Sequence, residues 1–296
     1  MTDRLTKKYK DLTAVDELSL SVRKGELFSL LGVNGAGKTT TVKMLACLLK
    51  PTSGDAIIGG RSIVKEPQKV KEIISLSPQE TAVAPALTVC ENLKLMCGVH
   101  GFKSDKTAAK VREMTELFGL GAVSGKKAGK LSGGWQRRLS IAMALISEPQ
   151  ILFLDEPTLG LDVIARSDLW AILKELKGKV TVILTTHYME EANGSDDVVI
   201  IDGGKIAAKG SPVQLKNQWS RNYLHLYGDD GVLSRGLQSL NLSFEKSDGG
   251  VRVQMKDAEE ARAFLQKYPQ FCSDFEFMKG DMDDVFLAVT GKKLSD

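Results

Sequence analysis

The stretch GVNGAGKTT, residues 32–40, constrains the fold of this chain more than any other segment. It fits the pattern G-x-x-x-x-G-K-[S/T], follows the apolar run LFSLL and precedes the helix-like run TVKMLACLL. Glycines in such a turn let backbone N–H groups point at a polyphosphate, and the dipole of the following helix adds favourable partial charge there. The pattern predicts a buried strand, a phosphate-binding loop and a helix. A glycine-rich turn that holds no ligand is the alternative.

The residues of this loop have separate expected roles. Lys38 is expected to reach the β- and γ-phosphates of a nucleotide, and Thr39 is expected to ligate Mg²⁺ through its hydroxyl. The other residues of the loop that we expect to contact the nucleotide are Gly32, Asn34, Gly35, Ala36, Gly37 and Thr40.

Two further apolar runs end on chemically active side chains. ILFLDEP, residues 151–157, places Asp155 and Glu156 where open α/β sheets bind their ligands. We expect Asp155 to hold Mg²⁺ through water and Glu156 to accept a proton from the attacking water, unless the pair only caps a turn. His187 follows the run VTVILTT, where its imidazole could donate to a γ-phosphate oxygen or be purely structural.

Two isolated residues are weaker candidates. Gln79, in SLSPQE, follows a short apolar run, and at such a hinge its amide could sense Mg²⁺ and the attacking water. Surface glutamines are common, so an ordinary exposed side chain is the alternative. Tyr9 could stack on an adenine or pack as an ordinary aromatic.

The segment LSGG, residues 131–134, opens a second helix. Ser132, Gly133 and Gly134 form a helix N-terminus that could receive phosphate, although the first loop already encloses the phosphates of one nucleotide. We therefore expect this turn to serve the nucleotide of another molecule, in a head-to-tail twofold dimer with nucleotide between the partners. A simple helix cap is the alternative.

The order of apolar runs predicts an α/β fold. Strand-like and helix-like runs alternate, which favours a mostly parallel sheet covered on both faces. From about residue 88 to residue 147 no strand is predicted, so this segment is expected to be a helical insert. We place a domain boundary at 215/216. The order strand, helix, strand, strand, helix, strand in residues 216–296 favours a small, ferredoxin-like α+β domain.

Composition excludes several classes of protein. The chain has 296 residues, of which 43% are hydrophobic, enough for one large core and a smaller one. Its 40 basic and 37 acidic residues leave a net charge of +3, which argues against nucleic acid as a partner. No signal peptide and no apolar run of roughly 20 residues is present, so we expect a cytoplasmic chain that reaches a membrane only through a partner.

The phosphate loop, LSGG, ILFLDEP, LGLD and the histidine occur in that order, so residues 5–213 resemble the nucleotide-binding subunit of an ATP-binding cassette (ABC) transporter. The resemblance implies a P-loop NTPase with an ABC-type RecA-like core in residues 1–215, a helical subdomain at about 88–147, and hydrolysis of ATP with Mg²⁺. It also implies a second copy, or a homologous ATPase, as the partner in the dimer.

Residue roles follow from the same resemblance. Tyr9 is similar to the aromatic that stacks on adenine, and Gln79 to the loop glutamine that couples nucleotide state to the membrane subunit. Residues 132–134 resemble the signature loop that grips the opposite γ-phosphate. Asp162 resembles the loop aspartate that acts across the dimer, and His187 the switch histidine.

The segments PTSG, HYMEEA and DMDDVFLAVTGK resemble the exporter branch of this family. This implies a subunit that couples ATP hydrolysis to export of a drug, antibiotic, lipid or ion through a separate membrane permease, at the inner face of the cell membrane. A soluble ABC-type ATPase that acts as a mechanical switch in assembly or regulation is the alternative. A P-loop kinase would leave LSGG and His187 unexplained.

Four features depart from the family pattern. Trp135 stands where a glutamine or methionine is usual, and Leu159 replaces the usual serine beside the GLD loop. The segment NGSDDV follows EEA where a longer amphipathic helix is typical. The chain also begins almost directly at LTKKYK, so we expect the usual first strand to be short or missing.

Overall fold

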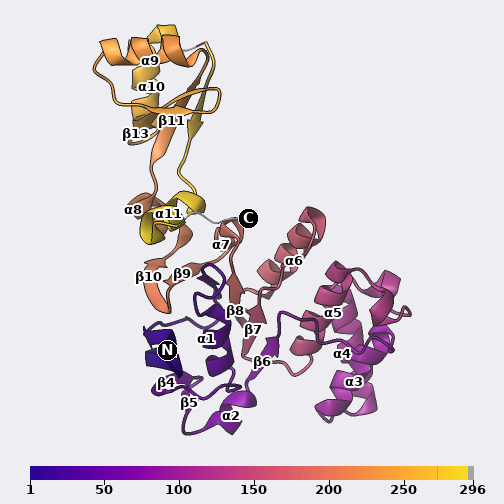
Figure 1. Ribbon diagram of the computed structural model, residues 1–296. Helices are drawn as coiled ribbons and strands as arrows, with labels where there is room; N and C mark the ends of the chain where they lie inside the picture. The colour runs from indigo at the N-terminus through magenta and orange to yellow at the C-terminus, as the bar shows by residue number, and fades with distance from the viewer. Residues whose placement is uncertain (272, 293–296) are drawn as a thin grey trace. The chain divides into compact units, whose positions relative to one another are not determined.

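The computed structural model describes residues 1–271 and 273–292 (Figure 1). The chain divides into two compact units, Met1–Ser211 and Pro212–Asp296, so the division comes slightly before the 215/216 position placed from the sequence. The helix α8 (Pro212–Trp219) explains this position, because it begins at the proline and belongs entirely to the second unit. Proline is favoured at the first position of a helix, where no backbone donor is needed.

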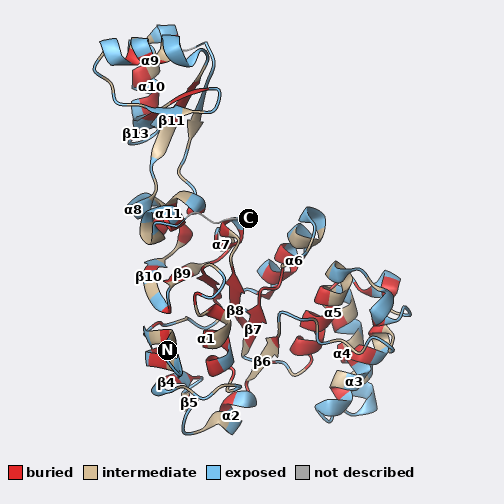
Figure 2. Ribbon diagram, in the orientation of Figure 1, coloured by how far each residue is buried: buried red, intermediate tan, exposed pale blue. Residues whose placement is uncertain are grey.

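The first unit is built on a six-stranded sheet. Its strands, in spatial order, are β10 (Lys205–Gly210), β9 (Asp197–Asp202), β3 (Leu27–Leu31), β8 (Thr181–Thr186), β7 (Ile151–Asp155) and β6 (Ile74–Ser77). All neighbours run parallel except β10, which pairs antiparallel with β9. Leu152 and Leu154 enter one hydrophobic cluster and Phe153 the other, so the sheet is buried on both faces (Figure 2). This burial explains the continuous apolar runs in the sequence.

The register of the sheet positions the candidate site. Strand β8 lies between β3 and β7, and the register pairs Leu31 with Thr186 and Asp155 with Thr185. Because the carboxyl ends of these parallel strands coincide, the phosphate loop, Glu156 and the segment at His187 follow at the same edge of the sheet.

A second, antiparallel sheet belongs to the same unit. Its strands, in spatial order, are β2 (Leu12–Leu18), β1 (Thr2–Tyr9), β4 (Ser53–Ile58) and β5 (Arg61–Ser62). The first strand, expected to be short or missing, is eight residues long. Its polar sequence buries only Thr2, Leu5 and Thr6, so hydropathy gave little sign of it.

Helices cover the six-stranded sheet and form the insert. The helices outside the insert are α1 (Lys38–Leu45), α2 (Pro67–Lys71), α6 (Val163–Leu176) and α7 (Met189–Ala192). Those between residues 88 and 147 are α3 (Val89–Val99), α4 (Ser104–Leu117) and α5 (Gly133–Leu145), with 3₁₀ turns η1 (Gly121–Val123) and η2 (Ala128–Lys130). A capping box between Thr88 and Glu91 starts α3, and Leu93, Phe118 and Leu139 are fully buried where the three helices pack.

The second unit contains a four-stranded antiparallel sheet. Its elements follow in the order β11 (Asn222–Tyr227), α9 (Asp230–Ser239), β12 (Glu245–Ser247), β13 (Gly250–Met255), α10 (Ala258–Lys267), 3₁₀ turn η3 (Pro269–Phe271) and β14 (Phe275–Met278). The spatial order of the strands is β12-β13-β11-β14. Helix α11 (Met282–Thr290) packs against α8. Across the described part of the chain, no helix combines the length and the apolar character needed to span a membrane.

Candidate functional site

A cavity of about 550 Å³ opens in the first unit around the phosphate loop. The residues proposed from the sequence that line it are Tyr9, Asn34, Gly35, Gly37, Lys38, Thr39, Thr40, Gln79, Glu156 and His187. Ala36 is buried beside the cavity, and Asp155 lies behind Thr39. The structure therefore brings together side chains from both ends of the first unit's sequence.

The phosphate loop requires glycine at two positions for steric reasons. Gly37 is the N-cap of α1 with a φ of 108°, and a Cβ there would lie 2.5 Å from the carbonyl oxygen of Ala14. A Cβ on Gly32 would lie 2.5 Å from the carbonyl oxygen of Ile201. The loop is therefore packed closely against neighbouring backbone, and its open side faces the cavity.

Lys38 is a buried cation within this loop. Its Nζ donates to the carbonyl oxygens of Gly32, at 2.7 Å, and Val33, at 3.2 Å, and lies 3.4 Å from Oε1 of Glu156. Burial lowers the pKa of Lys38, while the charges of Glu156 and Asp155 act in the opposite direction. An anion bound beside the Lys38 ammonium group would offset more of the free-energy cost of burying this charge.

Glu156 lies between two potential proton or charge partners. Its Oε2 is 3.5 Å from Nδ1 of His187, and its Oε1 faces Lys38. The Nδ1 atom is buried and makes no hydrogen bond within the described residues. Glu156 is 7% exposed, has a φ of 45°, and donates its backbone N–H to the hydroxyl of Thr185. A carboxylate held in this way at the edge of a cavity is suited to accept a proton.

An oxygen-rich pair lies beside Glu156. The Thr39 hydroxyl donates to Oδ1 of Asp155 at 3.0 Å, and the Thr185 hydroxyl donates to the same atom at 2.6 Å. Among the described residues, no cluster of three His, Cys, Asp or Glu side chains could enclose a metal ion. The pair nevertheless fits Mg²⁺, which proteins commonly hold through one or two side-chain oxygens, water and substrate phosphates.

Tyr9 and Gln79 line the cavity from its rim. The Tyr9 ring is 44% exposed, with the Lys7 ammonium 5.2 Å from its centroid. Gln79 is exposed, and its backbone carbonyl accepts a hydrogen bond from the guanidinium of Arg137, which also donates to the carbonyl of Pro78 at 2.7 Å. Because Arg137 belongs to α5, the Gln79 segment is tied to the helical insert. Arg137 was not predicted from the sequence, because an Arg-Arg pair in a helix resembles a solvated surface.

The LSGG turn and Asp162 are not brought into this cavity. Among the described residues that line it, none comes from residues 132–134. Ser132 is the exposed N-cap of α5 and makes no side-chain capping bond, whereas Asp162 caps α6 by accepting from the backbone N–H of Ala165 at 2.8 Å. The hydroxyl of Ser132 is therefore presented at the surface.

The two unusual side chains near these loops lie in different surroundings. Leu159 lines the cavity. Trp135 packs against the hydrophobic cluster of the insert, with the guanidinium of Arg138 4.9 Å from its ring centroid.

A buried carboxyl group that was not predicted from the sequence links two of the site's loops. Glu191, on the single-turn helix α7, accepts hydrogen bonds from the hydroxyls of Thr186, at 2.6 Å, and Thr158. Burial raises the pKa of Glu191, and these hydroxyls and the nearby Arg166 oppose that change. In the sequence Glu191 is the second acid of EEA, and its position soon after an apolar strand was the only signal.

Comparison with known proteins agrees with this geometry. The family described as ABC transporter matches residues 15–159. The daunorubicin/doxorubicin resistance ATP-binding protein DrrA of Streptomyces peucetius is 35% identical over 308 residues, covering 100% of this chain and 93% of that protein. The Nod factor export ATP-binding protein I of Burkholderia orbicola (strain AU 1054) is 35% identical over 295 residues, covering 98% and 96%.

A solved structure shares the fold of the first unit. The dimeric ATP-binding cassette MJ0796, in a post-hydrolysis state bound to ADP and Pi, has a TM-score of 0.65 and 27% identity, covering 71% of this chain and 97% of that one. The chain is 35% identical to DrrA over 93% of that protein, and its phosphate loop and the carboxylate of Glu156, just after a strand end, line one cavity. The chain therefore belongs to the ABC transporter family, as an ATP-binding subunit.

Proposed function

We propose that this chain hydrolyses ATP and that Glu156 is the general base. The observation that carries the proposal is the position of the Glu156 carboxylate, 3.4 Å from the Lys38 ammonium and 3.5 Å from the His187 imidazole, in a cavity beside the phosphate loop. Such a carboxylate can accept the proton of a water that attacks the γ-phosphate. His187 can donate to a γ-phosphate oxygen, and Lys38 can balance its charge.

The remaining residues of the cavity bind and orient the nucleotide. Thr39 and Asp155 would hold Mg²⁺, supported by their shared hydrogen bond. When bound, this ion would neutralise phosphate charge during transfer. Gln79 would contact the ion and the attacking water, and Tyr9 would stack on the adenine from the rim where it is exposed.

The LSGG turn supports a head-to-tail dimer. Ser132, Gly133 and Gly134 open a helix at the surface, outside the cavity of their own chain, and Asp162 lies exposed at the start of α6. A helix N-terminus is a good phosphate ligand, so this one would complete the site of a second copy or of a homologous ATPase. The dimeric state of MJ0796 with ADP and Pi supports this arrangement.

The names of the relatives support a role in export. One is named for daunorubicin and doxorubicin resistance and another for Nod factor export. The first name supports a drug or antibiotic as the exported substrate, among the drugs, antibiotics, lipids or ions that the family resemblance implies. The chain would bind a membrane permease at the inner face of the membrane. The hydrogen bonds from Arg137 to the Gln79 segment offer a rigid link between nucleotide state and that partner.

The test is the substitution Glu156→Gln. It keeps the size of the side chain and removes its basicity, so phosphate release should fall by about 10²-fold or more, while equilibrium binding of ATP is retained. Glu175→Gln, at an exposed position on α6, is the matched control and should leave both quantities unchanged. Full phosphate release by the Glu156 variant would exclude Glu156 as the base.

A further inference from the structure

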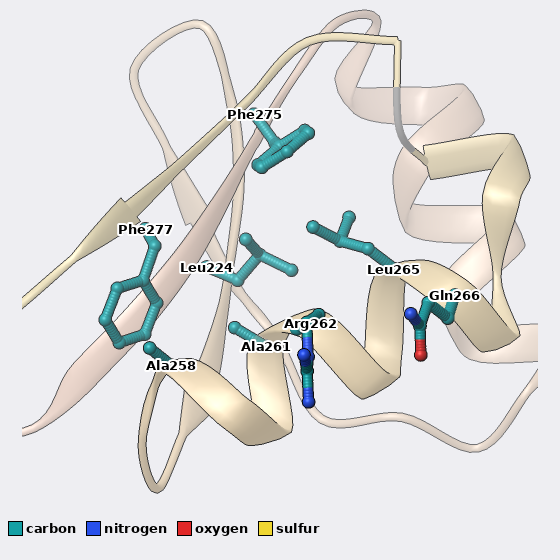
Figure 3. Close-up of a pocket in the computed structure, with 8 residues that line it drawn as sticks. All are labelled: Leu224, Ala258, Ala261, Arg262, Leu265, Gln266, Phe275 and Phe277. Carbon is teal, nitrogen blue, oxygen red and sulfur yellow. The ribbon is translucent and has the colours of Figure 1, made fainter.

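The second unit contains a cavity that has no part in the proposed nucleotide chemistry. It has a volume of about 510 Å³ and lies between helix α10 and strand β14, with Leu224 of β11 at its centre (Figure 3). Small-molecule pockets typically have volumes of about 300–1,000 Å³ and mostly apolar, aromatic walls. This cavity meets both conditions, because its lining includes Leu224, Leu265, Phe275 and Phe277.

The hollow has a simple origin in side-chain size. Ala258, Ala261 and Leu265 follow one another at spacings of three and four residues, so they share one face of α10. Two of the three are alanines, and they leave the helix unable to fill the space above the sheet. The register pairs Leu224 with Phe277 on adjacent strands, and Phe275 lies on the same face of β14.

Phe275 gives the cavity an exposed aromatic wall. Strand β14 is at the edge of its sheet, and the Phe275 side chain is 44% exposed although it points toward Leu224 and Leu265 (Figure 3). Covering a partly solvated ring with an apolar group is favourable, because it removes apolar surface from water. The walls therefore select for an apolar ligand body.

The polar groups of the lining select the ligand's head group. They are Arg262 and Gln266, one helical turn apart on α10, and none of the eight lining residues is acidic. The Arg262 side chain is 71% exposed, and its Nη2 is 3.9 Å from Oε1 of Glu259, a contact of little energy at the surface. Arg262 can therefore turn its donors to an anion at the mouth of the cavity.

We propose that this cavity binds an amphiphilic monoanion, a molecule with an aliphatic or aromatic body and one carboxylate or similar group. The body lies against Leu265, Phe275 and Phe277, above the buried Leu224, and the anionic group pairs with Arg262. Gln266 provides a second, neutral donor beside it. The site is separate from the ATP site in its lining residues and in its chemistry.

Calorimetric titration of the whole chain with decanoate tests the proposal. Decan-1-ol is the matched probe, since it has the same hydrocarbon chain without the charge. We expect saturable binding of one decanoate per chain, about two- to fivefold tighter than decan-1-ol because of the exposed ion pair. Arg262→Gln should abolish the preference for decanoate, whereas Arg235→Gln on α9, outside the cavity, should leave it unchanged.

A second variant tests the apolar part of the site. Ala258 is exposed at the start of α10, so Ala258→Leu can extend into the cavity without disturbing the core, and circular dichroism verifies the fold. Affinity for both probes should fall by about tenfold or more. Absence of saturable binding, equal affinity for the two probes, or unchanged affinity in Ala258→Leu would each overturn the proposal. A further contradicting result is that the unsubstituted chain binds no decanoate and that Ala258→Leu changes the sedimentation coefficient. That combination would mean that this face binds a second copy of the chain.

Discussion

At the scale of single residues, Glu156 is one of seven described non-glycine residues with a positive φ, and the one that lines the candidate site. A φ of 45° lies in the left-handed region, which costs a non-glycine residue about 1–2 kcal/mol. The structure holds this conformation through the bond from the Glu156 N–H to Thr185 and through the burial of the carboxylate between Lys38 and His187. The sequence identified Glu156 as an acid at a strand end, but a backbone conformation fixed by a neighbouring strand has no signal in the local sequence.

The contacts of Glu191 also could not be predicted from the local sequence. Its hydrogen-bond donors, Thr158 and Thr186, belong to the segments that follow β7 and end β8, and Arg166 belongs to α6. Because Thr158 and Arg166 are separated in sequence from Thr186 and Glu191 by most of α6 and by β8, only the folded sheet reveals that one carboxyl group joins the loop after Glu156 to the residue before His187.

The raised pKa of Glu191 makes a prediction about stability. Because burial raises its pKa in the folded chain, the folded state binds the proton more tightly than the unfolded state does. Wild type should therefore lose stability, relative to Glu191→Gln, as the pH rises above the ordinary glutamate pKa of about 4.3. The slope should reach at most about 1.4 kcal/mol per pH unit for one proton.

Urea unfolding of both proteins between pH 4 and pH 8 measures this difference. Glu190→Gln, at the exposed neighbouring position, controls for removing an acid from the same helix and should run parallel to wild type. A difference between wild type and Glu191→Gln that stays constant over the whole range would contradict the assignment.

At the scale of elements, hydropathy patterns predicted the strands that are buried on both faces and the helices of the insert. The strands β7 and β8 and the three helices of the insert follow from their apolar patterns, and so does the order of strands and helices from β11 to β14. The helices α8 and α11, which flank these elements in the second unit, were not predicted. Strand β1 does not follow from such a pattern, because only three of its eight residues are buried and its sequence, TDRLTKKY, is rich in charge. Its place is fixed by antiparallel pairing with β2 and β4, which is a tertiary effect.

The phosphate loop allows a comparison of two glycines that differ in their surroundings. Gly35 has a φ of 80° with nothing within 4 Å of an added Cβ, whereas Gly37 has a φ of 108° and a carbonyl oxygen at 2.5 Å. Gly35→Ala should therefore lower the free energy of unfolding by about 1–2 kcal/mol, the cost of the left-handed conformation alone. Gly37→Ala should cost clearly more, because the backbone of the loop must also move.

Urea unfolding without nucleotide, followed by tryptophan fluorescence, separates the two variants. Measuring without ATP removes any contribution from lost binding. Equal losses in Gly35→Ala and Gly37→Ala would mean that the close approach of the loop to Ala14 is not maintained in solution.

At the scale of the whole molecule, the proposed site is divided between two surfaces of the same chain. One is the cavity that contains Lys38 and Glu156, and the other is the exposed N-terminus of α5 at Ser132. The sequence suggested this division, because one nucleotide has no use for two phosphate-binding turns. In a dimer the two surfaces form one complete site only if the α5 N-terminus of each copy contacts the nucleotide bound by the other copy.

Gly133 offers a test of that dimer that leaves the single chain undisturbed. An added Cβ at Gly133 meets nothing within 4 Å, and the same holds for Gly98 on α3, a second exposed helical glycine. Both alanine variants should therefore fold as stably as wild type or slightly more so, since alanine favours helix. In an ATP-bound dimer, however, a methyl group on Gly133 would stand between the α5 terminus and the partner's phosphates.

We expect Gly133→Ala to lower the steady-state ATPase rate by about tenfold or more and to weaken ATP-dependent dimerisation in sedimentation experiments, with Gly98→Ala indistinguishable from wild type. In wild type the specific ATPase rate should rise with protein concentration, because only the dimer contains a complete site. The ATPase rate and the extent of dimerisation should fall together, because loss of the dimer must account for loss of turnover. Unimpaired hydrolysis by Gly133→Ala at a concentration where the chain is monomeric would mean that one copy suffices, and the α5 terminus would then be no more than a helix cap.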